Sequence, residues 1–459
     1  MSPRTAVVGG GLAGLAAALR LADQGDDVVL LEAKPRLGGL TSSFPRDSAV
    51  GALEVDTGQH VFLRCCTEYL ALLDRLGMRG QVHLQDRLTI PVARPRPGRP
   101  PQRARLRRSP LPAPAHLAVA LAGYRLLPPA DRLRVARAAL ALRGVDAAAP
   151  ATDARSFGAW LAEHGQRPAA VTALWDLIGV AALNSPADGA SLALAATVFQ
   201  IGLLSAAGAA DIGWSRVPLQ ELHGRAGERA LTAAGARVRT GVRVTALARE
   251  GAGWVVHTRE GTDVQGRELV DRVVLAVPPA TAEQLAPADA VALPDGWSAR
   301  LGAVPIVNVH VVYDRPVLDE PFLAAVDSPI QWVFDRTVAS GCPDGQYVAV
   351  SLSAARDVIG EPVAQVLQQI LPALADVLPR ARSARVLSSF VTRERQATFD
   401  PAPGQAGSRP PQRTAAPGLA LAGAWTDTGW PATMEGAVRS GNAAVAALGA
   451  GAGRTAVAA

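Results

Sequence analysis

The stretch GGGLAG at residues 9–14 lies between an apolar strand pattern, RTAVV at 4–8, and an apolar helix pattern, LAGLAAALRL at 12–21. Its three glycines in G-x-G-x-x-G spacing are Gly9, Gly11 and Gly14. In this spacing the first glycine makes a tight turn, the second lets a pyrophosphate approach the backbone, and the third lets helix and strand pack closely. The pyrophosphate would rest on the positive end of the helix. The stretch therefore predicts a dinucleotide site beside a buried strand.

The next turn makes this prediction more specific. A second strand pattern, DVVLL at 27–31, ends in Glu32, where an acidic residue can accept hydrogen bonds from an adenosine ribose. AKPRLGG at 33–39 then adds Arg36 and a glycine pair. An arginine can hold phosphate oxygens through two donors at once. The glycine fingerprint followed by E-x-x-x-R-x-G-G is a far more specific signal for a dinucleotide site than the fingerprint alone.

This start resembles the FAD-binding start of the flavin amine oxidase and phytoene desaturase superfamily. The resemblance implies FAD and an α/β fold, with an FAD-binding Rossmann-like (GR2-type) domain and a discontinuous α+β substrate domain. We expect the FAD-binding domain over 1–92, 215–280 and 400–459, and the substrate domain over 93–214 and 281–399. The residues of the first turns that the resemblance places at FAD are Gly9, Gly11, Leu12, Ala13, Gly14, Glu32, Ala33, Arg36, Gly38, Gly39 and Leu40.

The stretch GAWTDTGWPATMEGAVRSG at 423–441 indicates a strand end, an aromatic loop and a helix that starts with small residues. Such a helix start can present N–H groups to a flavin carbonyl or a phosphate. It resembles the C-terminal FAD motif of the superfamily, but Ala424 stands where an Asp is usual. The carboxylate for the ribityl hydroxyls is then missing or supplied by another group, such as Asp427. The resemblance places at FAD also Gly58, Gln59, Val244, Gly423, Ala424, Thr433, Met434, Glu435 and Ala437.

Three further stretches narrow the resemblance: VDTGQHVFLRCCTEY at 55–69, LNSP at 183–186 and DIGWSRVPL at 211–219. They are similar to the hydroxysqualene dehydroxylases, also called squalene-associated FAD-dependent desaturases. That family replaces an allylic hydroxyl on a C30 isoprenoid with hydrogen. The resemblance implies a long-chain isoprenoid substrate, hydride from reduced flavin, and isoprenoid synthases upstream as partners.

The reaction needs an acid for the leaving oxygen, and the family-specific stretches offer four catalytic candidates. They are Asp56, His60, Asp211 and Glu435. Each also has a structural interpretation. His60 suits a hydrogen-bonded core histidine, Asp211 a helix cap, and Glu435 a helix start that favours negative charge. A carboxylic acid serves only if burial raises its pKa toward neutrality.

Two other functions stay open. An enzyme of the same fold could be a carotenoid-type desaturase or isomerase, or an amine oxidase with Trp425 and Trp430 as the aromatic pair that holds the amine. A prenyl-lipid carrier could have lost the flavin, a hypothesis that Ala424 favours and the glycine turns with Glu32 oppose.

Composition and residue spacing argue against a nucleic-acid partner and against a metal site. The 459 residues carry a net charge of +6, Lys34 is the only lysine, and no basic run is interleaved with aromatic residues, so we expect no nucleic-acid partner. Cys65, Cys66 and Cys342 lack the spacing of a zinc site, and no metal is expected.

The stretch 87–130 contains nine arginines and no Asp or Glu. We expect its Pro-rich first part to lack regular structure, 113–127 to be helical, and 131–145 to form a basic amphipathic helix. An Arg-rich loop beside an apolar helix is typical of interfacial attachment, so 94–145 is a candidate membrane contact; the alternative is a solvated loop beside a core helix.

We expect a cytoplasmic location, with contact at the inner face of the cytoplasmic membrane. The first strand pattern begins at residue 4 and leaves no room for a signal peptide. No stretch offers eighteen uncharged apolar residues for a spanning helix.

Overall fold

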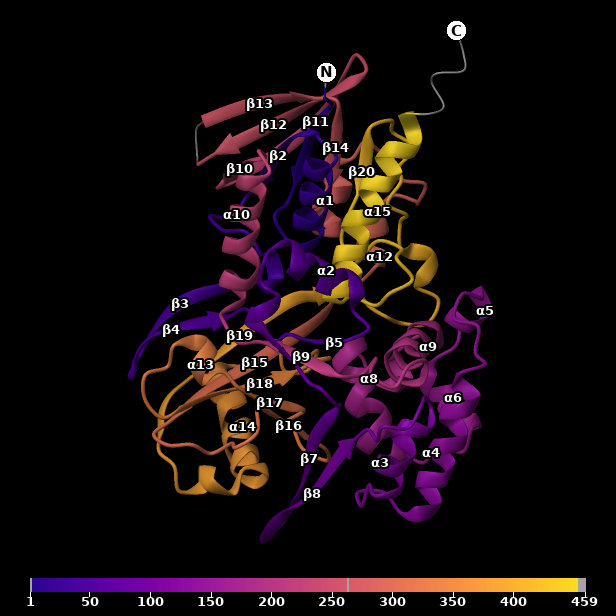
Figure 1. Cartoon of the computed structure of the whole chain (residues 1–459), viewed down its shortest axis with the longest axis vertical. Helices are drawn as coiled ribbons and strands as arrows, with labels where there is room; N and C mark the ends of the chain where they lie inside the picture. The colour runs from indigo at the N-terminus through magenta and orange to yellow at the C-terminus, as the bar shows by residue number, and fades with distance from the viewer. Residues whose placement is uncertain (1, 262–263, 453–459) are drawn as a thin grey trace.

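The computed structural model describes residues 2–261 and 264–452, and its upper part in Figure 1 is built on a five-stranded parallel sheet. The strand order is β10-β2-β1-β14-β20. The strands are β1 (Arg4–Val8), β2 (Asp27–Glu32), β10 (Arg237–Thr240), β14 (Arg272–Leu275) and β20 (Leu419–Leu421). All neighbours pair in parallel, and apolar runs such as VVLL fit a sheet that is covered on both faces.

Helices cover one face of this sheet and a small antiparallel sheet covers the other. Alternate residues such as Val7, Leu30 and Val274 share a core with α1 (Leu12–Asp23) and α15 (Met434–Ala452). Their sequence neighbours share a core with Trp254 on the other side. The elements beside the parallel sheet are α2 (Thr67–Arg75), α10 (Ala226–Ala233), β11 (Val242–Glu250), β12 (Gly253–Glu260) and β13 (Val264–Val270).

The lower part of Figure 1 contains a seven-stranded sheet in the order β19-β15-β18-β17-β16-β7-β8. Its strands are β7 (Thr89–Arg96), β8 (Arg99–Arg107), β15 (Val304–Tyr313), β16 (Phe322–Ala325), β17 (Trp332–Asp335), β18 (Gln346–Leu352) and β19 (Val386–Thr398). Helix α14 (Val363–Val377) packs its apolar side against one face of this sheet. The other face is directed toward the parallel sheet and the helical layer.

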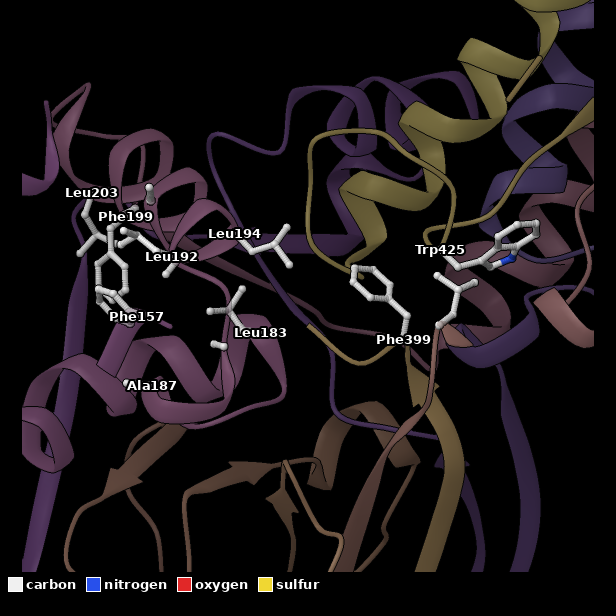
Figure 2. Packing of buried hydrophobic residues seen from close by; sticks show 14 of the residues in the cluster. Phe157, Leu183, Ala187, Leu192, Leu194, Phe199, Leu203, Phe399 and Trp425 are labelled. Carbon is white, nitrogen blue, oxygen red and sulfur yellow. The ribbon is translucent and has the colours of Figure 1, made fainter. Parts of the chain in front are cut away.

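The helical layer lies beside the seven-stranded sheet, and one apolar core extends from it to the C-terminal loop (Figure 2). Phe157 packs against Trp175 and Phe199, with ring centroids 5.7 and 5.4 Å apart. The helices of the layer are α3 (Ala118–Ala122), α4 (Pro129–Leu142), α5 (Pro150–Asp153), α6 (Phe157–Glu163), α7 (Pro168–Ala170), α8 (Asp176–Leu183) and α9 (Leu192–Phe199). Pro186 lies in the segment between α8 and α9.

Shorter elements join these parts. Single π-helical turns at Val171–Trp175, Gln200–Leu204 and Gln220–Arg225 adjoin α8, α9 and α10. The remaining strands and α-helices are β3 (Ser43–Ser48), β4 (Gly51–Asp56), β5 (Val61–Leu63), β6 (Val82–Leu84), β9 (Ile212–Ser215), α11 (Pro279–Leu285), α12 (Trp297–Arg300) and α13 (Thr337–Ser340).

The expectation of irregular structure after residue 87 is wrong. Residues 89–107 form the β7–β8 hairpin, in which buried Ile90 pairs with buried Leu106. Most of the prolines lie near the turn or in β8, which is an edge strand and does not need every N–H for its ladder. The expected domain boundary at residue 92 therefore falls inside β7, which belongs to the seven-stranded sheet.

Among the helices of the described residues, none is both long enough and apolar enough to cross a bilayer.

Candidate active site

The glycine turn after β1 has the close backbone contacts that its spacing requires. Gly9 has φ +106°, and a Cβ on Gly14 would lie 1.9 Å from the carbonyl oxygen of Gly9. At Gly11 the situation is different: a Cβ there would meet only the Cα of Gly39, 3.9 Å away. Gly11 is also the N-cap residue of α1, and as a glycine it supplies no side-chain acceptor to the first N–H groups of the helix. The space above Gly11 is therefore open to an anion at the start of the helix.

The second turn holds an acidic and a basic group beside this space. One carboxylate oxygen of Glu32 accepts from the N–H of Gly10 and the other from the N–H of Lys34, both at 2.7 Å. The buried Nε of Arg36 has no hydrogen-bond partner among the described residues. A dinucleotide fits this cradle, because its phosphates would satisfy an orphaned donor.

The first turns bring together most of the residues expected at the cofactor. Leu12, Ala13 and Gly14 form the buried first turn of α1, and Ala33 follows Glu32 directly. The N–H of Gly38 donates to the carbonyl oxygen of Gly10 at 2.8 Å, which ties the two glycine turns together. Leu40 is exposed beyond the glycine pair, and Val244 lies in β11 just before a bulge.

The C-terminal loop is held rigidly in front of α15. Gly423 has φ +148° and donates to Ser440 Oγ at 2.8 Å, while Trp425 stacks on Trp297 with ring centroids 5.4 Å apart. Thr433 Oγ1 accepts from the N–H of Gly436, so that α15 begins at Met434 with Ala437 in its first turn.

Ala424 leaves this loop without the carboxylate that the superfamily motif usually supplies. Asp427 is exposed, and its carboxylate accepts from the N–H of Gly429 within its own turn. Trp425 and Trp430, the two residues expected as an aromatic pair for an amine, have different surroundings: Trp425 is buried against Trp297, whereas Trp430 lines the cavity described below.

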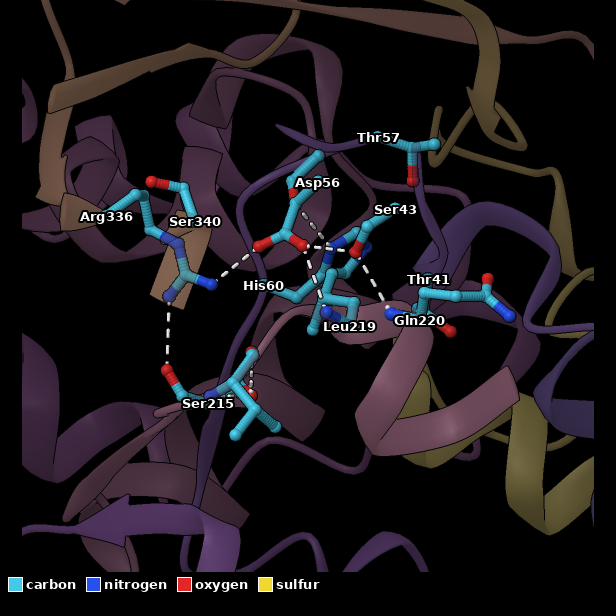
Figure 3. A network of polar contacts seen from close by, with 12 residues as sticks. Thr41, Ser43, Asp56, Thr57, His60, Ser215, Leu219, Gln220, Arg336 and Ser340 are labelled. Carbon is cyan, nitrogen blue, oxygen red and sulfur yellow. Dashed lines mark hydrogen bonds and ion pairs between the residues drawn. The ribbon is translucent and has the colours of Figure 1, made fainter. Parts of the chain in front are cut away.

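Asp56 is the centre of a buried polar network (Figure 3). Its carboxylate accepts from Ser43 Oγ at 2.6 Å, from the N–H of Leu219 at 3.0 Å and from Arg336 at 2.6 Å. Arg336 also donates to the carbonyl oxygen of Ser215. One of these three donors is the guanidinium group of the buried Arg336. The network joins the end of β4 to the segment between β17 and α13, and through Arg336 to β9.

Asp211 is likewise surrounded by donors. It accepts from Arg108 at 2.6 and 2.9 Å, from Arg64 at 3.1 Å and from the N–H of Leu88 at 2.7 Å, and it is fully buried. The helix-cap interpretation is wrong, because the backbone group that Asp211 binds precedes the strand β7. Its geometry is that of a structural ion-pair centre.

His60 and Glu435 are the other two catalytic candidates. His60 Nδ1 donates to the carbonyl oxygen of Gly58 at 3.0 Å, and burial lowers the pKa of the ring, which favours the neutral form with Nε2 free to accept. Glu435 accepts from the N–H groups of Glu68 and Tyr69 and from Arg439. Burial raises the pKa of Glu435, and this residue lines the cavity.

An apolar cavity of about 180 Å³ lies between the helical layer, β5, β7 and the start of α15. Its walls are aliphatic and aromatic with few polar groups, which suits a hydrocarbon chain. Representative lining residues are Val61, Leu63, Cys65, Ile90, Ile178, Val198, Trp332, Trp430, Met434 and Glu435. Within the described part of the chain, no cluster of three or more His, Cys, Asp or Glu residues could hold a metal ion.

One buried polar residue of the seven-stranded sheet, Asn308, is not among the predicted site residues. Asn308 lies in the apolar strand pattern PIVNVHVV, and its side chain is buried beside Gly58. The available signal was the spacing of Asn308 and His310, two polar residues on one face of an otherwise apolar strand.

Residues 12–449 match the profile of the family described as flavin containing amine oxidoreductase. The chain belongs to this family. It is similar, with 30% identity over 97% of this chain and 98% of the relative, to the hydroxysqualene dehydroxylase of Rhodopseudomonas palustris. A zeta-carotene desaturase of Arabidopsis thaliana is 23% identical over 96% of this chain and 84% of its own length. In fold, the present chain is similar to an oxidoreductase of Methanosarcina mazei, with a TM-score of 0.71 and 18% identity. The similarity covers 96% of this chain and 99% of that one.

This member of the flavin amine oxidoreductase family is therefore a flavin-dependent oxidoreductase. The expected flavin-binding α/β fold is confirmed. A flavin-free carrier is not supported.

Proposed function

We propose that this flavin enzyme binds FAD and removes the hydroxyl group of a hydroxysqualene-type C30 alcohol reductively, giving squalene. The observation that carries the proposal is the apolar cavity whose lining includes Met434 and Glu435, at the start of α15. The whole-length similarity to a hydroxysqualene dehydroxylase supports the same reaction.

The adenine-bearing half of FAD would lie along the glycine turns, with its phosphates near Gly11 and Arg36. The start of α15 would face the flavin end. When bound and reduced, FAD supplies a hydride. Because an allylic cation reacts with water, the aliphatic walls of the cavity serve the reaction by excluding it.

The chain must also protonate the leaving oxygen. Glu435 is the candidate that we carry forward, because this residue lines the cavity and burial raises the pKa of its carboxyl group. Asp56 and Asp211 bind arginines as Glu435 binds Arg439, but neither of them is among the residues that line the cavity. His60 could accept a hydrogen bond at Nε2 and so orient a hydroxyl group.

The test uses the purified full-length protein, loaded with FAD and reduced without oxygen. We expect squalene from hydroxysqualene, detected by gas chromatography with mass spectrometry. The same protein with oxidised FAD and a quinone acceptor should leave phytoene unchanged. Desaturated products from phytoene, with no squalene from the alcohol, would replace the proposal with a desaturase.

We also propose that the face carrying α3, α4 and the β7–β8 hairpin contacts an anionic bilayer, from which the apolar substrate would enter. Four large apolar residues are exposed here: Leu111, Val119, Leu133 and Leu140. Arg94, Arg105 and Arg134 on the same elements are paired with carboxylates. Six arginines on or next to these elements form no ion pair among the described residues: Arg96, Arg99, Arg107, Arg125, Arg137 and Arg143. Each basic side chain near an anionic surface contributes about 1 kcal/mol.

Flotation with vesicles should show this contact. We expect the protein to float with vesicles containing phosphatidylglycerol at low salt, and much less at high salt or with neutral vesicles. Val119→Asp combined with Leu133→Asp should reduce flotation about tenfold or more, because two charges would enter the interface. Val338→Asp is the matched control, since Val338 is 88% exposed but lies on α13. Equal loss in the control, or no flotation at low salt, would contradict the proposal.

A further inference from the structure

Asn308 lies on the same face of the seven-stranded sheet as Trp332, a residue of the cavity wall, although Asn308 is not itself one of the lining residues. Trp332, which lines the cavity, lies opposite Ser351 of β18, and Ser351 lies opposite Asn308 of β15. Residues directly opposite each other in neighbouring strands have their side chains on the same face of a sheet. Asn308 therefore faces the same side as Trp332, two strands further from β7.

Asn308 is buried without hydrogen bonds. It is 1% exposed, and neither its Oδ1 nor its Nδ2 has a partner among the described residues. A Cβ on Gly58 would lie 4.0 Å from its Nδ2, so the amide group points at the loop that carries His60. The Nε2 of Gln59, in the same loop, is also buried without a partner.

A lack of hydrogen-bond partners is not a general property of the polar side chains on this sheet. His310 lies two residues along β15 on the same face and is paired. Its Nδ1 and Nε2 pair with Tyr347 and Thr392 at 2.6 and 2.9 Å. A buried amide that lacks both its donor and its acceptor contacts is rare and costly, so an incoming group is expected to satisfy it.

We propose that Asn308 binds the hydroxyl group of the substrate and thereby selects an alcohol over a hydrocarbon; this inference rests on the proposed dehydroxylation. A hydroxyl group both donates and accepts, which is what the amide requires: Nδ2–H donates to the hydroxyl oxygen, and Oδ1 accepts its hydrogen. Squalene or phytoene would leave both amide atoms unpaired. Asn308 would thus hold the oxygen beside the Gly58–His60 loop, beyond the apolar lining of the cavity, before the bond to carbon breaks.

The test compares binding without turnover. In the FAD-loaded, oxidised, full-length protein, hydroxysqualene should bind about 10- to 100-fold more tightly than squalene, measured by the change in flavin absorbance during titration. In Asn308→Leu this preference should fall to about threefold or less, with squalene binding unchanged. Flavin content and reduction potential should stay as in the wild type. Asn308→Ser, which retains a donor and an acceptor, should keep part of the preference, and Ser351→Ala should keep all of it.

Several results would overturn the inference. If Asn308→Leu retains the preference, the amide does not bind the hydroxyl group. If the variant instead shifts the flavin spectrum or reduction potential and keeps the preference, Asn308 contacts the flavin ring. These outcomes differ from a failure of the proposed function, in which the wild type itself forms no squalene from hydroxysqualene. Replacing an unpaired amide with leucine should not lower the thermal unfolding midpoint of the apoprotein, so loss of fold is not an expected explanation.

Discussion

Gly11→Ala is expected to lose the flavin while remaining folded. Gly11 has φ −76°, which alanine adopts readily, and its added methyl group would meet no protein atom closer than 3.9 Å. The same methyl group would occupy the space where the phosphates approach the backbone. A clash of this kind weakens flavin binding by about 10- to 100-fold, judged from the usual cost of overpacking. Flavin titration of the apoprotein and the ratio of flavin to protein absorbance measure it.

Gly14→Ala is the matched control and should fail differently. Its methyl group would lie 1.9 Å from the carbonyl oxygen of Gly9, a backbone atom that cannot move without displacing β1 from α1. We expect little folded protein from this variant. In Gly11→Ala the thermal unfolding midpoint of the apoprotein should fall by no more than about 2 °C. Full flavin content in folded Gly11→Ala would show that the cofactor does not lie on this turn.

Arg336→Met is expected to lower the free energy of unfolding by about 3–5 kcal/mol. The side chains of Arg336 and Asp56 are only 10% and 4% exposed, and their charged atoms lie 2.6 Å apart. Removing the cation leaves the Asp56 carboxylate buried with two neutral donors, Ser43 and the N–H of Leu219, and a buried charge without its partner is costly. Thermal and urea unfolding of the apoprotein measure the loss.

Two further variants separate this cause from loss of packing. Asp56→Asn added to Arg336→Met removes the stranded charge and should restore part of the stability. Arg75→Met breaks an exposed ion pair with Asp23, 2.7 Å long, and should cost less than about 1 kcal/mol. If the double variant is no more stable than Arg336→Met, the charge of Asp56 is not the reason for the loss.

The nucleotide-binding part of the fold could be predicted because its signals are local. The glycine spacing occupies a few consecutive residues, and so does each of the apolar runs at β1, β2 and β14. These runs are recognisable because parallel strands covered on both faces are apolar throughout. The hairpin β7–β8 was missed because its prolines and exposed arginines conceal the inward residues Ile90, Val92 and Leu106. Its pairing with β16 joins segments more than two hundred residues apart, which no local pattern records.

The candidate site was predicted less completely for the same reason. Residues in the glycine turns are recognisable from their neighbours in sequence. The roles of Asp56 and Asp211 depend on Arg336 and Arg108, which come from distant segments and convert both carboxylates into ion-pair centres. Asn308 could be recognised as a candidate only from the pairing of three strands, which places it on the same face of the sheet as Trp332.

The parallel sheet takes its strands from widely separated segments, and this has a consequence for biosynthesis. β1 is made long before β20 and the covering helix α15, which follow only at residues 419–452. Until then the apolar side of α1 lacks its neighbour, so the nascent chain exposes a surface on which chaperones act. Assembly from such distant contacts is slow. Loading of the yellow coenzyme is therefore expected only after α15 has left the ribosome.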